Sequence, residues 1–153
     1  MLRATIAVAV TVAVGATLGA APAKLPSDSD LAVVRLDPAP AAPGGSTTVH
    51  GFVANLGPDR TASPFTVLID VPAGFTLLAA SFPTDCVTSA AGHLVRCTFP
   101  PGLPWLRTAT VLAPVQVGRD VPHGTVAEGH VRVFGLDDRH PENNSTPFSL
   151  TVS

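Results

Sequence analysis

Hydrophobic and polar residues alternate along much of this chain, and that alternation predicts β-strands. Residues 65–71 read Phe-Thr-Val-Leu-Ile-Asp-Val, so that every second side chain is apolar and would lie on one face of a strand. Residues 109–117, 127–133 and 148–152 show the same period of two. A period of two with one polar face is typical of antiparallel sheets that cover a core on one side.

Four further β-rich runs lie between Gly, Pro and Asn residues, at 31–36, 47–54, 75–80 and 93–99. No run shows a helical period. The chain is therefore predicted to be all-β, an immunoglobulin-like antiparallel β-sandwich of seven to eight strands. Pro114 falls inside one predicted strand, and because proline cannot donate to a ladder, we expect it at a sheet edge or a bulge.

The amino-terminal segment is typical of an export signal. No charged residue lies between Arg3 and Lys24, and this apolar run closes with the small residues Ala21-Pro22-Ala23. We expect a signal-peptide helix over residues 1–23, a polar lead-in over 24–30 and one domain over 31–153. An uncleaved membrane anchor is the alternative, because about 20 apolar residues can span a bilayer.

The amino-acid composition indicates where the protein is located and which classes of partner it is expected to lack. Low Lys with high Ala, Pro, Val and Arg suggests a GC-rich bacterial genome, and the formal net charge is −2. The basic residues are scattered singly, which argues against a nucleic-acid partner. No second long apolar run follows the signal, so we expect no membrane association after cleavage and a secreted or cell-surface location.

The chain has two cysteines, Cys86 and Cys97, on either side of the predicted hairpin tip Ala90-Ala91-Gly92. In an exported protein two cysteines most simply form a disulfide. In the chain-entropy model, closing so short a loop stabilises a fold by about 2 to 3 kcal/mol. A redox or metal-binding pair is the alternative, although that chemistry favours a Cys-x-x-Cys spacing or nearby histidines.

Three polar or glycine-containing turns separate the predicted strands. In the first, Asn55 can bond its own backbone two residues on, Gly57 can take a positive φ, and Pro58 stops the strand. A Pro-Ala-Gly corner and an asparagine-rich segment before the last strand serve the same purpose. The predicted structural turn residues are Asn55, Gly57, Pro58, Pro72, Gly74, Pro141, Asn143 and Asn144.

Taken in order, these turns and the cysteine pair resemble the bacterial extracellular repeat family catalogued as domain of unknown function eleven. Its members carry an Asn-x-Gly-Pro turn, a Pro-Ala-Gly corner and a closing Pro-x-Asn-Asn segment, and the resemblance covers residues 31–152. It implies an immunoglobulin-like sandwich of seven or eight strands on exported or cell-surface proteins, with no established catalytic activity.

The last turn is also rich in oxygen ligands. A calcium site is the alternative interpretation of this turn. We expect no metal and no cofactor, because EF-hand spacing is absent and Asp and Asn commonly form self-bonding turns. The candidate calcium ligands are Asp137, Asp138, Glu142 and Asn144.

Trp105 follows the proline-rich run at residues 100–104. We expect it to be buried, closing one end of the sandwich; an exposed Trp105 would instead be an aromatic anchor for a sugar or protein. No Gly-x-Ser-x-Gly elbow and no glycosidase-like carboxylate pair is evident, so we predict no catalytic residues and no enzyme activity.

The sequence favours a noncatalytic secreted or cell-surface module with a structural, adhesive or partner-binding role. Its partner would be an extracellular protein or a polysaccharide. A secreted polysaccharide-binding module, which would use Trp105, is the main alternative. A secreted enzyme inhibitor that presents the Cys86–Cys97 hairpin as a rigid loop is a further one.

Overall fold

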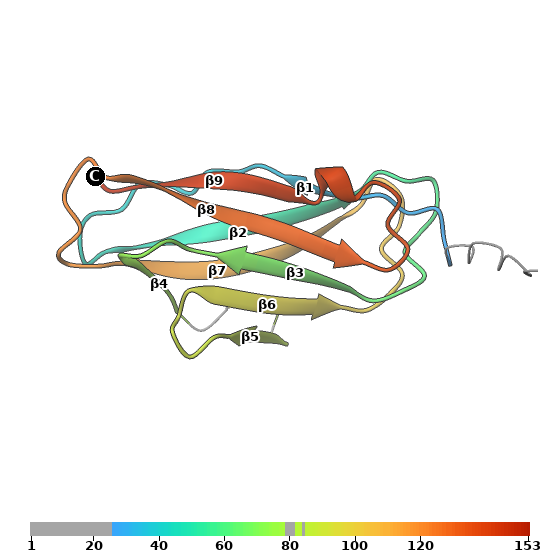
Figure 1. Ribbon diagram of the computed structural model, residues 1–153, viewed down its shortest axis with the longest axis horizontal. Coiled ribbons are helices and arrows are strands. Elements are labelled where there is room, and N and C mark those ends of the chain that lie inside the picture. Colours follow the sequence, from blue (N-terminus) through green and yellow to red (C-terminus); the bar gives the residue numbers. More distant parts are fainter. Residues whose placement is uncertain (1–25, 79–81, 84) are drawn as a thin grey trace, which may run out of the picture.

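The computed structural model describes residues 26–78, 82–83 and 85–153, and the predicted signal peptide at 1–23 lies outside them. The described residues form nine strands and one short 3₁₀ helix, η1, before the last strand (Figure 1). Within these ranges no helix is long and apolar enough to cross a bilayer. The elements are β1 (Leu31–Val34), β2 (Ser46–Asn55), β3 (Phe65–Asp70), β4 (Phe75–Leu77), β5 (Cys86–Thr88), β6 (Leu94–Phe99), β7 (Thr108–Val117), β8 (Val126–Gly135), η1 (Pro141–Asn143) and β9 (Ser145–Thr151).

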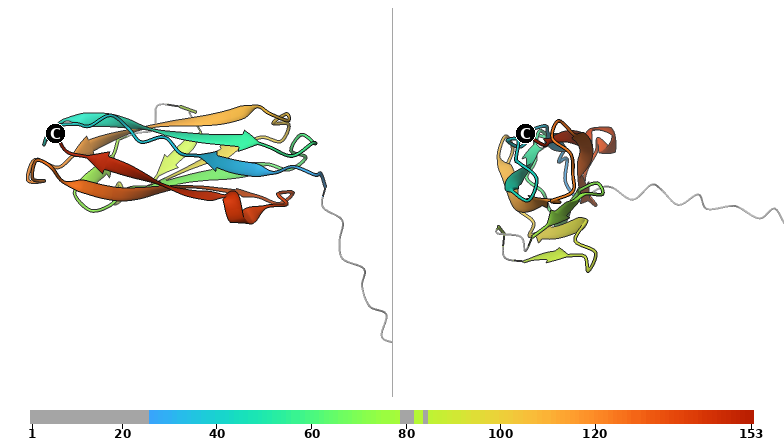
Figure 2. Two further views of the ribbon diagram at one scale, coloured as in Figure 1. Left: turned by 90° about the horizontal axis from the view of Figure 1, so that it is seen from above. Right: turned by 90° about the vertical axis from the view of Figure 1, so that its left-hand side faces the viewer.

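The strands form two antiparallel sheets that face each other. One sheet has the order β1-β2-β7-β4 and the other β5-β6-β3-β8-β9. The end-on view in Figure 2 shows the two layers enclosing a single interior. The predicted fold class, an all-β immunoglobulin-like sandwich, is confirmed. The ninth strand is the short β5, which forms the first half of the predicted cysteine hairpin.

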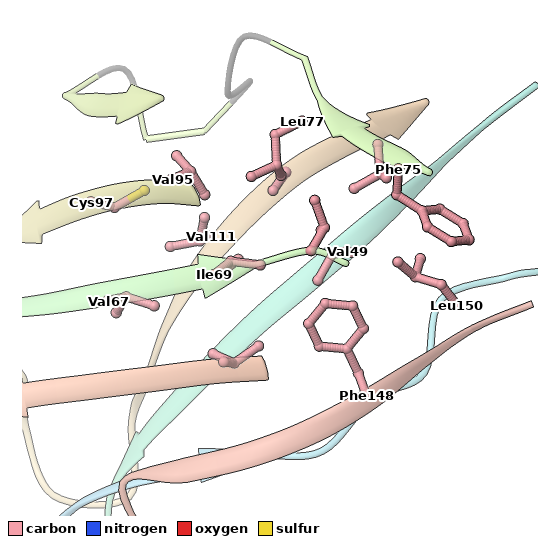
Figure 3. Close-up of a cluster of buried hydrophobic side chains, with 14 of the residues drawn as sticks. Val49, Val67, Ile69, Phe75, Leu77, Val95, Cys97, Val111, Phe148 and Leu150 are labelled. Carbon is pink, nitrogen blue, oxygen red and sulfur yellow. The ribbon is translucent and has the colours of Figure 1, made fainter. Parts of the chain in front are cut away.

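The alternating rows predicted from the sequence meet in the core. Figure 3 shows side chains from both sheets pointing at one another, among them Ile69, Val111 and Phe148, which are at most 1% exposed. Burying a side chain of this size contributes about 1.5 to 3 kcal/mol. The apolar residues at every second position therefore form the core, because each strand buries one of its two faces.

Gly129 belongs to one of these rows, and the space around it admits no side chain. A Cβ at this position would lie 2.4 Å from Cζ of Phe148 and 2.6 Å from the carbonyl oxygen of Asp70. The phenyl ring of Phe148 thus occupies the volume that a side chain on β8 would need. Close approach of an aromatic ring is one of the reasons for a glycine inside a strand.

Pro114 lies in an interior strand, but at an irregular point of its ladder, as expected for a proline: β4 pairs with β7 only as far as Val115, and Leu78 and Phe82 are the next described partners on that side. It sits in β7 between β2 and β4, paired in register with Thr48. Its carbonyl accepts a hydrogen bond from the Leu78 amide at 2.9 Å, so its nitrogen faces the same side, where β4 has already ended at Leu77. The missing N–H is tolerated because, among the described residues, the regular pairing with β4 stops before Pro114.

The predicted disulfide between Cys86 and Cys97 is confirmed. The two residues are register partners on β5 and β6 with their Cα atoms 4.2 Å apart, within reach of a disulfide-linked cross-strand pair. The tip of this hairpin is also tied to the sandwich, because the Leu77 amide donates to the Gly92 carbonyl at 2.7 Å. The hairpin is therefore fastened at both of its ends.

Replacing Gly129 by alanine should destabilise the fold by about 1 to 3 kcal/mol, because the new methyl group overlaps the Phe148 ring. Urea denaturation of the single and double variants checks this. A second change, Phe148→Leu, should recover part of the loss, since it removes the ring atoms that clash. Strictly additive losses would contradict the close approach.

Candidate binding groove

The Asn55 side chain joins three chain segments at one end of the sandwich. It is fully buried, and its Oδ1 accepts hydrogen bonds from the Asp30 and Gly57 amides, both at 3.2 Å. Its Nδ2 donates to the carbonyls of Asp59 and Leu103 at 2.7 and 2.9 Å. One amide thus connects the lead-in, the loop after β2 and the proline-rich loop.

Gly57 serves this turn in a different way from the one expected. It does not take a positive φ, so the conformational argument from the sequence is wrong. A Cβ at this position would lie only 2.4 Å from the Asp28 carbonyl oxygen. Glycine is required because the lead-in passes directly against the turn. By contrast, Gly74 in the Pro-Ala-Gly corner does have a positive φ of 89°.

Thr61 holds the proline-rich loop against the sandwich. It is 1% exposed, and its Oγ1 accepts hydrogen bonds from the amides of Gly102 and Leu103, each at 3.0 Å. The backbones of these segments bond as well, since the Thr61 amide donates to the Leu103 carbonyl at 3.1 Å. The loop that follows β6 is therefore rigidly placed.

A groove of about 540 Å³ lies between this loop and β7. The rings of Phe65 and Phe99 stack within it, with centroids 5.1 Å apart and planes within 7°. Neither charged nor ionisable side chains occur among the described residues of its lining. Those residues are Phe65, Phe82, Phe99, Pro100, Pro101, Gly102, Leu103, Pro104, Thr108, Ala109 and Thr110.

Trp105 is exposed, and the expectation that it closes the end of the sandwich is wrong. Its exposed fraction is 57%, and the neighbouring Leu106 has a positive φ of 54°. The Leu106 amide donates to the Asn55 carbonyl and the Arg107 amide to the Pro104 carbonyl. These bonds make a tight turn that presents Trp105 to solvent, while Leu103 packs against the core instead.

The predicted calcium ligands do not converge on one point. Asp138 accepts hydrogen bonds from the amides of Leu31 and His140 and from the Asn144 side chain. Asp137 accepts its hydrogen bonds from Ser27 and Ala62 instead. Glu142 is exposed and pairs with His140. In the part of the chain that the structure describes, no three His, Cys, Asp or Glu side chains gather as metal ligands.

Asp137 is a buried carboxylate that fastens the amino-terminal lead-in. Burial raises its pKa, but hydrogen bonds from the Ser27 hydroxyl at 2.5 Å and the Ala62 amide at 2.6 Å outweigh this and hold the pKa below its ordinary value. The Asp137 carbonyl also accepts a bond from the hydroxyl of the fully buried Ser29. The Oδ2 atom and the carbonyl oxygen of Asp137 are thus used for hydrogen bonds within the protein.

The sequence did not point to the groove as a site. Only its proline-rich wall stood out, as the connection before Trp105. Phe65 and Phe99 fall in predicted strands and Phe82 in none of them, and no local pattern places residues 65, 82 and 99 around one hollow. The sequence feature that could have indicated the groove is the pair Thr108 and Thr110, which follows the proline-rich run closely.

Solved structures share this architecture at low sequence identity. One chain of the CaDoc0917–CaCohA2 complex is 11% identical with a TM-score of 0.52, over 82% of this chain and 99% of that chain. The major pilin subunit of Bacillus cereus is 11% identical with a TM-score of 0.53, over 82% of this chain and 39% of the pilin. These similarities show the fold. The sequence matches no family model and no curated protein, so the resemblance to domain of unknown function eleven stays a prediction.

Replacing Asn55 by alanine should destabilise the protein by about 3 kcal/mol or more, because two amides and two carbonyls lose their partner in a buried place. The matched control is Leu56→Ala at the adjacent, half-exposed residue, which should change stability by less than about 1 kcal/mol. Equal effects in chemical denaturation would contradict the central position of Asn55.

Replacing Asp137 by asparagine should destabilise the protein near neutral pH and less so in acid. A carboxyl whose folded pKa lies below its unfolded value stabilises the fold above about pH 4, and this contribution is lost as the pH falls through the folded pKa. Denaturation midpoints of both proteins between pH 7 and pH 2 measure the difference. Asp120→Asn, at an exposed position, serves as the control, and a pH-independent deficit for Asp137→Asn would contradict the assignment.

Proposed function

We propose that this chain is a noncatalytic module, secreted or held at a bacterial cell surface, that binds a partner protein through the groove beside β7. The observation that carries the proposal is the groove itself, a hollow of about 540 Å³ with an apolar and uncharged lining. Concave apolar surfaces of this size are where proteins bind ligands. A lining without ionisable groups suits binding rather than acid–base or nucleophilic chemistry.

The extracellular location rests on sequence features and on the disulfide. The apolar amino-terminal run is typical of an export signal, and a structural disulfide is typical of oxidising compartments. The resemblance to domain of unknown function eleven fits the same location. The two similar structures come from a two-protein complex and from a pilin subunit, which supports a role in protein assembly.

Binding of a polysaccharide is a second candidate function, and the exposure of Trp105 favours it. An exposed indole can stack on the apolar face of a sugar ring, and Leu106 beside it is 62% exposed. This pair does not line the groove, so the two functions use different residues. An inhibitory role for the cysteine hairpin is less favoured, because its tip is bonded to β4 and does not project freely.

The proposal predicts that partner binding depends on the groove. The mature protein, residues 24–153, would be immobilised and used to capture proteins from the envelope and medium of the producing cell, with quantification by mass spectrometry. Phe82→Ser, in the groove, should lower the affinity for the specific partner at least about tenfold, as expected for an anchor residue. Phe134→Ser is the matched control, since Phe134 is similarly exposed but lies outside the groove.

Trp105→Ala separates the two candidate functions. If the partner is a protein in the groove, this variant should retain capture, and a glycan array should give no signal that depends on Trp105. Glycan binding that is lost in Trp105→Ala and kept in Phe82→Ser would contradict the proposal and support the polysaccharide function. Equal capture by Phe82→Ser and the unmodified protein would also contradict it.

A further inference from the structure

One side of β7 is only partly paired. β2 runs beside β7 from Ala54 to Ser46, whereas β4 pairs only with the last three residues of β7, Val115 to Val117. Beyond β4, the Leu78 amide still donates to the Pro114 carbonyl, and the Leu112 amide donates to the Phe82 carbonyl. In the described parts of the chain, no strand pairs with the first residues of β7 on this side.

The backbone direction of β7 shows which groups are left unpaired. Residues of an antiparallel strand direct their N–H and C=O alternately to the two sides. Because Leu112 and Pro114 bond toward the β4 side, Thr108 and Thr110 face that side too. No described residue forms a hydrogen bond with the outward N–H or C=O of either threonine, and both threonines line the groove.

The edges on β1 and β9 are covered in part by side chains or by proline. On β1 the Leu31 amide is bonded by Asp138, and on β9 the Ser149 amide is bonded by Asp37 at 2.8 Å. Pro147, on the same outward side of β9, has no N–H to offer. β5 is an edge of three residues only. Natural sheets protect their edges in these ways, whereas the groups of Thr108 and Thr110 lie open inside an apolar groove.

We propose that the groove binds an extended, uncharged peptide segment of the partner protein, which adds a strand to the sheet beside Thr108 and Thr110. This inference rests on the proposed function and specifies its ligand. The added strand would continue the line of β4 and Phe82 along β7. Its main chain would satisfy the free groups of the two threonines, and alternate side chains would enter the hollow over Phe65 and Phe99.

Hydrogen-bonding and charge complementarity favour this occupant. The free donors and acceptors repeat at every second residue of β7, which is the repeat of a β-strand. The facing wall contains Pro100, Pro101 and Pro104, which have no N–H and so cannot form a regular ladder, whereas β7 can form one with the occupant. A lining without charge has no partner for an ionised side chain, so the inserted residues should be uncharged.

A phage-displayed library of random heptapeptides, selected on the mature protein, supplies the probe. The enriched peptide would be synthesised with blocked termini and with each amide N-methylated in turn, and binding would be measured by calorimetry. Methylation of every second amide should lower affinity at least tenfold, and methylation of the amides between them should have little effect. That alternation is the signature of one-sided strand pairing.

Proline variants of the protein test the same contact from the other side. Thr110→Pro removes the outward N–H and should lower peptide affinity at least tenfold, and Pro114 shows that β7 accepts proline at a position of this kind. Thr88→Pro, on the β5 edge, is the matched control and should bind the peptide normally. Circular dichroism and thermal melting establish that both variants fold.

Several outcomes would overturn the inference. They are a selection without an enriched peptide, an N-methyl scan without alternation, or equal binding by Thr110→Pro and Thr88→Pro. Self-association of the mature protein that Thr110→Pro abolishes, without peptide binding, would assign the edge to a second copy. If Phe82→Ser lowers partner capture but the scan shows no alternation, the proposed function stands and the added strand is wrong.

Discussion

The buried amide of Asn55 is the interaction on which one end of this sandwich depends. The lead-in, the loop after β2 and the proline-rich loop meet there, and their backbones would otherwise bury unpaired polar groups. A neutral amide can donate and accept in the same place, which a carboxylate cannot do. With Thr61 and Asp137 it fixes the loops as rigid walls. The groove is therefore preformed, and preformed surfaces bind at a smaller cost in conformational entropy.

The groove exists because the strands of one sheet differ in length. β7 has ten residues and β4 has three, so β4 does not reach the first part of β7, where Phe82 at Leu112 is the last described partner on that side. Pro114 marks the boundary, since its nitrogen could not continue the ladder with a longer β4. Pro114 thus coincides with the end of β4 pairing, and the groove lies further along β7, beside Thr108 to Thr110.

Much of the fold could be predicted from the sequence, because period two, turn chemistry and the cysteine pair are local signals. The rows at residues 65–71 and 148–152 became core faces, and the Asn55 side chain bonds the Gly57 amide as its residue type suggested. Trp105 could not be placed in this way. The orientation of Trp105 depends on two backbone hydrogen bonds, from the Leu106 amide to the Asn55 carbonyl and from the Arg107 amide to the Pro104 carbonyl. No local sequence pattern indicates that Leu103, and not Trp105, packs against the core.

The sequence by itself determined the class of fold, the disulfide hairpin and the strand faces, because these follow from alternation and from residue chemistry at short range. The tertiary structure alone decided which strand edges stay open, why Gly57 must be glycine and which phenylalanines surround a hollow. Each of these depends on contacts between segments separated by many residues in the chain, such as Gly57 against Asp28 and Phe82 against Leu112. The candidate binding groove belongs to this second group, since it is formed where distant segments fail to cover one another.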